Sequence, residues 1–266
     1  MHGVSSSATT PRTMSTHRER ILEQFTRQAV PFSTAPGIKD DRALALLVEA
    51  SGAGPEDTVL DVACGPGLVV AAFGRVVRHA TGIDVTPAML ARAREVTAGL
   101  ANVTLDQGDV QALPYADGTF SIVVSRFAFH HFQDPGAVLR EMRRVCRPGG
   151  RVVVCDLLAS DDPEKAAAFH RIEMLRDPSH VRALTLAELE GLFAAQGIAA
   201  PAHTYYRLPF ELEGLLERSF PRPEDVATIR AAYTAAVDGD TLGLGTHRKG
   251  DEIRSAYPVA ILSASR

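Results

Sequence analysis

The hydrophobic pattern of this chain alternates between short apolar runs and longer amphipathic stretches. Residues 58–62 form one such run, in which Val59, Leu60 and Val62 are apolar on both faces of an extended strand. Such a run is typical of a buried parallel strand. Stretches with apolar residues at helical spacing follow most of these runs. Because parallel strands joined by helices produce this alternation, the pattern predicts an α/β protein with a largely parallel sheet.

Seven strands are predicted, at residues 58–62, 79–84, 102–107, 121–125, 151–155, 201–208 and 257–262. The predicted helices cover residues 17–29, 40–51, 68–77, 87–98, 135–145, 166–175 and 185–197, and two more lie within 210–237. The helix at 166–175 has mixed periodicity, which indicates a lid rather than a core layer. Asp134 with Pro135, and Thr185 with Glu188, are typical helix-start signals.

One domain is expected. The chain has 266 residues, enough for a single large α/β core. Residues 1–14 are polar and without periodicity, so we predict a disordered leader, followed by one domain over residues 15–266. The glycine-rich segment 238–250 is predicted to be a mobile loop.

A glycine turn follows the first apolar run. Gly65 and Gly67 allow the backbone to come close to a ligand where a Cβ atom would collide. Asp61 is a carboxylate inside an apolar strand, which is costly unless it has a partner. We therefore expect Asp61 to accept hydrogen bonds from amides of the turn or from a ligand ammonium group.

Two further carboxylates follow predicted strands. Asp84 comes 84 − 61 = 23 residues after Asp61, about the spacing at which a βα unit returns an acid to the ribose of a bound nucleoside. Asp84 as a helix cap is the alternative, although Thr86 and Pro87 already supply a cap and a first helical residue. Asp109 can accept from an adenine amino group while Val110 packs on the ring, or it is a turn residue.

These residues resemble the motifs of a known family. The pattern Asp61-x-Ala63-x-Gly65-x-Gly67 is similar to the first motif of the class I S-adenosylmethionine-dependent methyltransferases, with alanine in place of the first glycine. The dinucleotide fingerprint fits less well, because its third small residue would be Val70. Residues 58–156 resemble the subfamily that includes quinone-biosynthesis C-methyltransferases and natural-product O-methyltransferases.

The resemblance implies a Rossmann-like, doubly wound sheet of seven mostly parallel strands in the order 3-2-1-4-5-7-6, with helical lid segments. Residues 53–157 would form the cofactor-binding core, and residues 15–52 would form an N-terminal helical lid. Residues 158–184 and 209–250 would be insertions that cover the substrate.

The cofactor implied by the resemblance is S-adenosyl-L-methionine. The residues expected to bind it come from the glycine turn and from the strand ends around that turn. They are Asp61, Ala63, Cys64, Gly65, Gly67, Asp84, Val85, Met89, Asp109, Val110 and Arg126. No metal site is expected, because we find no clear set of acidic ligands.

Two histidines follow the fourth predicted strand, near the expected methyl group. Neutral His130 or His131 would be a suitable base at pH 7. Asp156 ends the fifth strand, 156 − 130 = 26 residues after His130, and the two resemble the His and Asp pair of similar O-methyltransferases. We predict His130 as the base, oriented by Asp156, with His131 as the second candidate. Structural roles for Asp156 and for one histidine stay open.

The predicted reaction is methyl transfer from S-adenosyl-L-methionine to a small-molecule acceptor, by O- or C-methylation of a phenol, quinone, glycoside or similar metabolite. Two alternatives stay open: a protein that binds S-adenosyl-L-methionine without transfer, and an atypical NAD-dependent oxidoreductase. The sequence does not identify the acceptor. Its pocket is expected to be apolar, with Phe25, Phe32, Phe127, Phe129, Phe169, Tyr205 and Tyr206 as candidate lining residues.

The net charge and the cysteine content indicate which classes of partner and which cellular compartment to expect. With 28 Lys and Arg against 32 Asp and Glu, the net charge is −4, so no basic excess indicates nucleic acid or an anionic membrane. Cys64, Cys146 and Cys155 are odd in number and predict free thiols in the cytoplasm. No apolar run is long enough to span a membrane. The oligomeric state is not determined, and a homodimer stays open.

Overall fold

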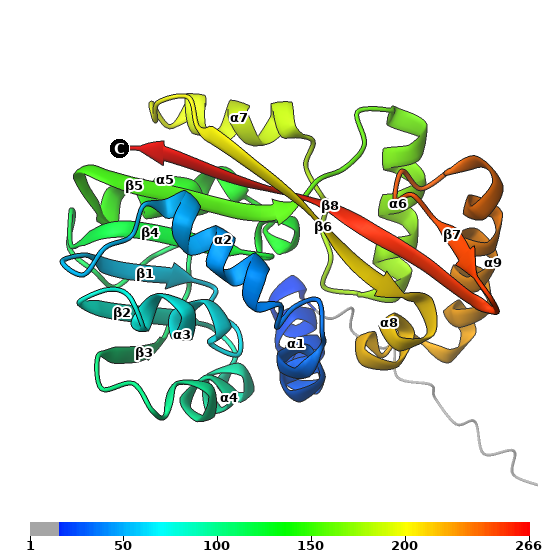
Figure 1. The fold of residues 1–266 in the computed structure, drawn as a ribbon, viewed down its shortest axis with the longest axis horizontal. Coiled ribbons are helices and arrows are strands. Elements are labelled where there is room, and N and C mark those ends of the chain that lie inside the picture. Colours follow the sequence, from blue (N-terminus) through cyan, green and yellow to red (C-terminus); the bar gives the residue numbers. More distant parts are fainter. Residues whose placement is uncertain (1–15) are drawn as a thin grey trace, which may run out of the picture.

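The computed structural model describes residues 16–266 (Figure 1). The predicted disordered leader lies outside the described residues. The strands are β1 (Thr58–Val62), β2 (His79–Asp84), β3 (Val103–Gln107), β4 (Phe120–Arg126), β5 (Cys146–Leu157), β6 (Ala202–Glu211), β7 (His247–Lys249) and β8 (Glu252–Ser265). The helices are α1 (His17–Thr34), α2 (Asp41–Ser51), α3 (Leu68–Gly74), α4 (Pro87–Thr97), the 3-10 helix η1 (Phe129–His131), α5 (Pro135–Val145), α6 (Pro163–Arg176), α7 (Leu186–Ala195), α8 (Leu212–Ser219) and α9 (Pro223–Gly239).

The strands of the described chain form one mixed sheet in the order β3-β2-β1-β4-β5-β8-β6, with β7 paired to β8 alone. The neighbours from β3 to β5 are parallel, and β8 is antiparallel to both β5 and β6. The predicted fold class and strand order are confirmed, with β8 as the predicted seventh strand. The extra strand β7 lies in the segment predicted to be a mobile loop. It forms because Gly250, with a φ of 62°, closes a tight turn between Lys249 and Glu252.

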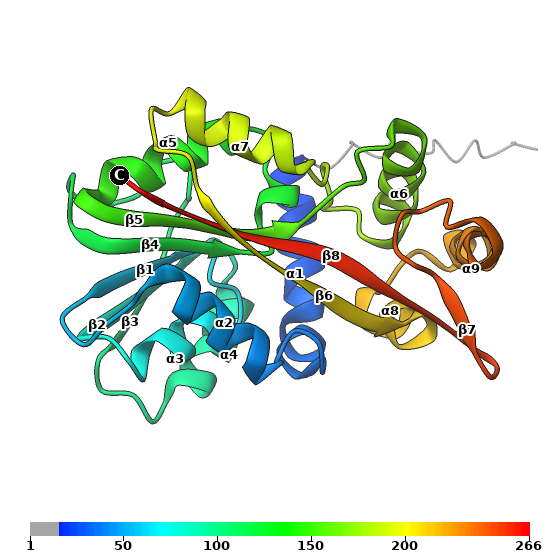
Figure 2. The same ribbon diagram turned by 45° about the horizontal axis from the view of Figure 1, so that its top comes forward.

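Helices cover both faces of the sheet (Figures 1 and 2). Helices α2, α3 and α4 lie on one face, and α5 and α7 lie on the other. Adjacent residues of β1 point to different cores: Val59 belongs to the core that contains Phe73 of α3, whereas Leu60 belongs to the core that contains Leu139 of α5. The sheet is therefore buried on both sides, as its apolar runs predict. Among residues 16–266, no helix combines the length and the apolar character required to cross a membrane.

Strands β6 and β8 form a long antiparallel ribbon that extends beyond the rest of the sheet (Figure 2). Only residues 259–265 of β8 pair with β5. Helices α6, α8 and α9 lie around the extension together with β7, and we call these four elements the cover. The predicted start of the last strand at residue 257 is too late, because β6 and β7 supply backbone partners to residues 252–256.

Helix α1 lies between the sheet and the cover (Figure 2). A capping box of Thr16 and Glu19 begins the helix, which runs through Pro31 to Thr34. The predicted end at residue 29 is therefore wrong. Proline removes one backbone donor from a helix, and contacts of α1 with α4 and α8 hold the helix in place despite that loss.

The sequence signals for two other helix starts are confirmed. Asp134 caps α5, because its carboxylate accepts the amide hydrogen of Ala137 at 2.8 Å. Thr185 and Glu188 form the capping box of α7. Local side-chain chemistry therefore positions both helices that cover the α5 face of the sheet.

Helix α6 lacks an apolar stripe because its buried side carries charges. Glu173 is fully buried, and its Oε2 lies 2.5 Å from Nη2 of Arg176. Glu173 also accepts from the hydroxyl of Tyr257 at 3.1 Å, and Nη1 of Arg176 donates to Oγ of Ser219 at 2.9 Å. This polar network joins α6 to β8 and to α8, so it holds the cover together.

Replacing Glu173 with Gln is expected to lower the free energy of unfolding by about 3–5 kcal/mol, because Arg176 would keep its charge in a buried site without a carboxylate. Urea unfolding measures the change. The matched control is Glu213→Gln, since Glu213 forms a similar pair with Arg230 at the surface, where a pair contributes little. Equal effects of the two substitutions would contradict the role assigned to the buried network.

Candidate functional site

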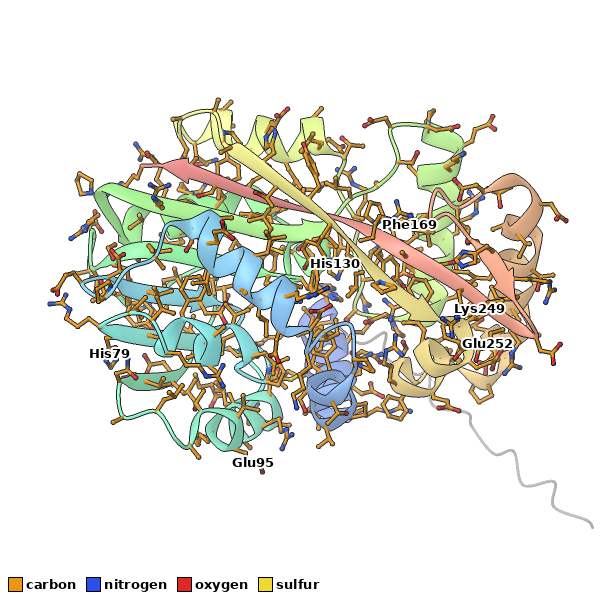
Figure 3. The ribbon with its side chains drawn as sticks, viewed as in Figure 1. His79, Glu95, His130, Phe169, Lys249 and Glu252 are labelled. Atoms are coloured by element: carbon orange, nitrogen blue, oxygen red, sulfur yellow. The ribbon has the colours of Figure 1, made fainter. Side chains whose placement is uncertain are left out.

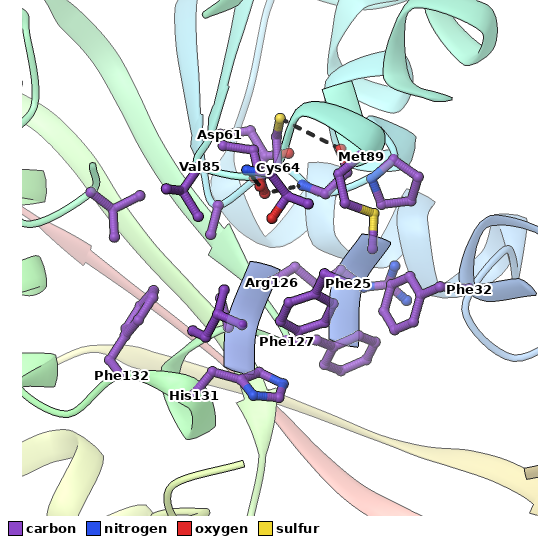
Figure 4. A pocket seen from close by; sticks show the side chains of 18 of the residues that line it. Phe25, Phe32, Asp61, Cys64, Val85, Met89, Arg126, Phe127, His131 and Phe132 are labelled. Carbon is purple, nitrogen blue, oxygen red and sulfur yellow. Dashed lines mark hydrogen bonds between the residues drawn. The ribbon is translucent and has the colours of Figure 1, made fainter. Parts of the chain in front are cut away.

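A cavity of about 210 Å³ opens at the carboxyl ends of β1, β2 and β4 (Figure 4). Ten of the eleven residues predicted to bind the cofactor line it: Asp61, Ala63, Cys64, Gly65, Asp84, Val85, Met89, Asp109, Val110 and Arg126. Gly67 does not line it. A Cβ atom on Gly67 would lie 2.8 Å from the Cβ of Ala93, so this glycine allows α3 and α4 to pack closely.

The turn between β1 and α3 has left-handed backbone at three residues. The φ angles are 60° at Ala63, 50° at Gly65 and 79° at Gly67. Glycine adopts this conformation readily, whereas a residue with a Cβ atom loses roughly 1–2 kcal/mol. Ala63, where the family motif has glycine, is therefore strained at the wall of the cavity.

Asp84 holds this turn in place. Its two carboxylate oxygens accept the amide hydrogens of Gly65 and Thr86, each at 2.8 Å. Thr86 is the N-cap residue of α4, but its side chain makes no capping hydrogen bond. The predicted positions of Thr86 as the N-cap residue and Pro87 in the first turn are confirmed, although the Thr86 side chain makes no capping bond. Asp84 still lines the cavity, and each of its oxygens can accept a second hydrogen bond.

Asp61 is buried without a partner. Neither of its carboxylate oxygens has a hydrogen bond of standard geometry to any residue in the described range. The expected bonds from amides of the turn are therefore wrong, and a ligand ammonium stays a prediction. Burial raises the pKa of Asp61 well above its usual value, and the nearby charge of Asp84 raises it further, whereas Arg126 opposes both. A carboxyl group in this position requires a proton or a cationic partner.

Arg126 also keeps unused hydrogen-bonding groups. Its Nη1 donates to the carbonyl oxygen of Ile38 at 3.0 Å. Its Nε and Nη2 are buried and lack a partner among residues 16–266. The guanidinium group stacks 4.3 Å from the ring centroid of Phe127, a residue whose φ angle of 56° is strained. Asp61 and Arg126 therefore line one cavity, and both carry polar atoms that have no hydrogen-bond partner among the described residues.

The first turn of α1 contributes side chains that the sequence analysis did not assign to a site. Nε2 of His17 lies 2.8 Å from the carbonyl oxygen of His131, and Nη1 of Arg18 lies 3.6 Å from the carboxylate of Asp109. Both α1 residues line the cavity. Polar residues on an amphipathic helix usually face solvent, so their spacing alone carried no signal of this role.

A second cavity, of about 80 Å³, lies beside the first. The residues that line both are Phe25, Phe32, Ile38, Phe127 and His131. His130, the predicted base, lines only the second cavity. Figure 3 places His130 near the centre of the molecule, where the sheet meets the cover.

His130 and Asp156 form the predicted pair. Nδ1 of His130 lies 2.5 Å from Oδ1 of Asp156. Asp156 also accepts the amide hydrogens of Phe129 and Leu157, each at 2.7 Å, so the structural role left open for it is present as well. Burial disfavours a charged His130, but the carboxylate of Asp156 outweighs this effect, and the pKa of His130 is raised overall.

His131 has the opposite electrostatic environment. Its Nδ1 lies 3.1 Å from the carbonyl oxygen of Ser179, and its ring centroid lies 4.2 Å from that of His130. Burial and the neighbouring His130 lower the pKa of His131 to about 4. His131 is therefore neutral at pH 7, and unlike His130 it reaches the first cavity.

Three of the seven aromatic residues expected around an acceptor, namely Phe25, Phe32 and Phe127, line the cavities. The other four lie elsewhere. Phe129 and Phe169 are buried in the two cores, Tyr205 is exposed on the outer strand β6, and the Tyr206 hydroxyl lies 3.6 Å from Sγ of Cys155. The three cysteines are free and buried, as predicted. Alternation along a strand cannot show which aromatic residue faces a cavity rather than a core.

Comparison with known proteins finds relatives that cover this region. The model of the methyltransferase domain family matches residues 60–154. The uncharacterized methyltransferase YcgJ of Bacillus subtilis is 31% identical over 73% of this chain and 78% of its own length. The ubiquinone/menaquinone biosynthesis C-methyltransferase UbiE of Teredinibacter turnerae is 37% identical over 41% of this chain and 46% of its own length.

A solved structure supports the same relationship. The crystal structure of YcgJ from Bacillus subtilis has a TM-score of 0.77 and 27% identity, and the match covers 85% of this chain and 98% of that one. The structural likeness therefore includes the N-terminal or cover regions beyond residues 60–154.

Replacing Ala63 with glycine is expected to raise the free energy of unfolding by about 1 kcal/mol, because the substitution removes the left-handed strain at residue 63. The matched control is Ala128→Gly, since Ala128 also lines the cavity but has a φ angle of −126°. The control should lower stability by about 0.5–1 kcal/mol, because glycine gains more freedom in the unfolded chain. Thermal or urea unfolding compares the two, and equal destabilisation would contradict the strain at Ala63.

Proposed function

This chain belongs to the class I S-adenosylmethionine-dependent methyltransferases, and we propose that it methylates a small-molecule acceptor held in the second cavity. The observation that carries the proposal is the pair of adjoining cavities. The first is lined by Asp61, Ala63 and Gly65 of the motif, and the second is lined by His130 and His131. Family membership sets aside the NAD-dependent alternative.

The unpartnered groups of the first cavity fit the amino-acid end of S-adenosyl-L-methionine. This end carries an ammonium group and a carboxylate, which are complementary to the carboxylate of Asp61 and the free Nε and Nη2 of Arg126. Charged hydrogen bonds of this kind contribute roughly 1.5–3 kcal/mol each. We therefore assign Asp61 to the ammonium group and Arg126 to the carboxylate.

The remaining motif residues suit the nucleoside end. Asp84 keeps lone pairs for the two ribose hydroxyls while its existing bonds hold the turn. Asp109 and Val110 line the same cavity, so we assign them to the adenine amino group and ring, and Met89 adds an apolar wall. The glycine turn places backbone rather than side chains against the ligand.

S-adenosyl-L-methionine supplies a methyl group that is already activated on a sulfonium sulfur. The task left to the protein is to align the acceptor and to exclude water. Phe25, Phe32 and Phe127 line both cavities, so the region where the cavities meet is apolar. Helix α1 closes the first cavity through His17 and Arg18.

The pair of His130 and Asp156 suits removal of a proton from an acceptor hydroxyl. When His130 is neutral and Nδ1–H donates to Asp156, its Nε2 is the acceptor. Backbone amides fix the Asp156 carboxylate, so the imidazole ring has a defined orientation. His131, which lines both cavities, stays the second candidate base.

The choice between O- and C-methylation stays open within this proposal. The His130 and Asp156 pair supports O-methylation of a phenol or another hydroxyl. Similarity to a protein named as a quinone-biosynthesis C-methyltransferase supports transfer to an activated carbon. The apolar walls of both cavities favour a phenol or quinone over a glycoside.

We expect the affinity for S-adenosylhomocysteine, which has the same amino-acid end, to increase as pH rises. A protonated Asp61 cannot pair with the ligand ammonium, and the raised pKa of Asp61 keeps it protonated above its usual range. The affinity for S-adenosylhomocysteine should increase as pH rises through the raised pKa of Asp61. In Asp61→Asn the pH dependence should disappear, and affinity at the higher pH should fall by roughly tenfold or more. Calorimetry between about pH 5 and pH 8 measures both.

The control is Asp109→Asn, because Asp109 lines the same cavity but is exposed and pairs with Arg18. This variant should keep the pH dependence of the wild type. If Asp61→Asn also kept it, Asp61 would not face the ammonium group. If the wild-type protein did not bind S-adenosylhomocysteine, the assignment of the first cavity to the cofactor would be wrong.

His130→Gln is expected to lower kcat by roughly 10²–10⁴, while the affinity for S-adenosylhomocysteine stays close to that of the wild type. In the wild type, kcat/KM should increase as pH rises through the raised pKa of His130, because only the neutral imidazole accepts a proton. In His130→Gln, kcat/KM should no longer increase over that pH range. The assay uses S-adenosyl-L-methionine with a labelled methyl group against a panel of phenols and quinones.

His131→Gln is the matched variant on the same turn. A large loss in His131→Gln with normal activity in His130→Gln would transfer the role of base to His131. Normal activity in both would rule out a histidine base and favour carbon methylation or an acceptor that binds already ionised.

A further inference from the structure

An arginine of the cover faces the second cavity, and the proposed methyl transfer does not require it. Arg218, on α8, lines this cavity and is half-buried. Within the described range it has no hydrogen bond and no ion pair within 4 Å. An unpaired guanidinium group that has lost part of its hydration is unfavourable, so this position requires an explanation.

The other charged groups that line the cavity have partners. Arg176 is bound to Glu173 and to Ser219. Asp177 accepts from the amide and the hydroxyl of Ser179, at 2.9 and 2.5 Å. His130 is held by Asp156. Arg218 is therefore the cation left unmatched among the charged residues that line the second cavity.

The surroundings of Arg218 do not neutralise it. The carboxylate of Glu211 accepts the amide hydrogens of Glu213 and Gly214 at the start of α8, and it acts on Arg218 only from outside ion-pairing distance. Burial lowers the pKa of Arg218 and Arg176 adds to this effect, whereas Tyr257 and Glu211 oppose it. Because Arg218 has no ion pair of its own among the described residues, its guanidinium group can pair with an anion in the cavity.

We propose that the methyl acceptor carries a carboxylate group, which Arg218 binds while an apolar body of the acceptor fills the second cavity. The inference rests on the proposed function, because it takes the second cavity as the acceptor site. Leu208, Phe210 and Leu215 supply apolar walls beside Arg218. One unmatched guanidinium group balances one negative charge, whereas a phosphate dianion would leave excess negative charge facing Asp177.

The test compares three small probes with the wild-type protein saturated with S-adenosylhomocysteine. Phenylacetate has the expected carboxylate, phenylacetamide is its neutral counterpart, and phenyl phosphate is the dianionic alternative. NMR titration or calorimetry gives each affinity. Phenylacetate should bind roughly tenfold to a hundredfold more tightly than phenylacetamide, as expected for a charged hydrogen bond, and more tightly than phenyl phosphate.

Arg218→Gln should remove the preference for phenylacetate, and Arg218→Lys should keep part of it. Arg222→Gln is the matched control, since Arg222 is exposed and lies four residues further along the chain. Its preference should match that of the wild type. Unchanged S-adenosylhomocysteine affinity and unfolding midpoint in Arg218→Gln would show that the variant is folded.

The proposal is overturned if phenylacetate does not bind, if it binds no better than phenylacetamide, or if Arg218→Gln keeps the preference. Tighter binding of phenyl phosphate would replace the carboxylate with a phosphate and would equally contradict it. These outcomes are distinct from failure of the proposed function, because that failure would appear first as a loss of S-adenosylhomocysteine binding by the wild type.

Discussion

The parallel register of β1 with its neighbours is the constraint on which the site depends. Asp61 is paired with Gly82 of β2 and with Val124 of β4. A shift by one residue would turn Asp61 to the other face of the sheet and remove it from the cavity. Gly82 is part of this constraint, because a Cβ atom there would lie 2.7 Å from Val70 Cγ2 and 2.9 Å from Cys64 Sγ. The glycine allows the turn and α3 to lie close against β2.

Strain and unsatisfied charge occur together at the ends of β1 and β4. Ala63 and Phe127 have left-handed backbone, and each follows within two residues a charged residue whose polar atoms lack hydrogen-bond partners, Asp61 and Arg126. Strained residues of this kind cost of order 1–3 kcal/mol each and persist only when the surrounding structure holds them. The two apolar cores on either side of the sheet supply that support. A ligand that satisfies both charges would therefore stabilise the fold.

The residues that meet at the first cavity could be predicted from the sequence, because their signals are local. Asp61, Asp84 and Asp109 follow consecutive apolar runs, and parallel strands bring their carboxyl ends to one edge. The cover could not be predicted in the same way. Glu173 and Arg176 look like surface residues in a helix of mixed periodicity, and only the contacts with Tyr257 and Ser219 explain their burial. Those contacts join positions far apart in the chain, so no local pattern records them.

The long strand β8 connects the two halves of the site. Near its carboxyl end it pairs with β5, where Ala260 lies opposite Asp156, and three residues earlier Tyr257 binds Glu173 in the cover. The orientation of His130 and the shape of the second cavity therefore depend on one continuous strand. The motif residues of the first cavity, such as Asp61, Asp84 and Arg126, lie on strands β1, β2 and β4, outside the cover. Sequence changes in the cover can thus alter the second cavity while the motif residues stay the same, so the family motif does not determine which acceptor binds.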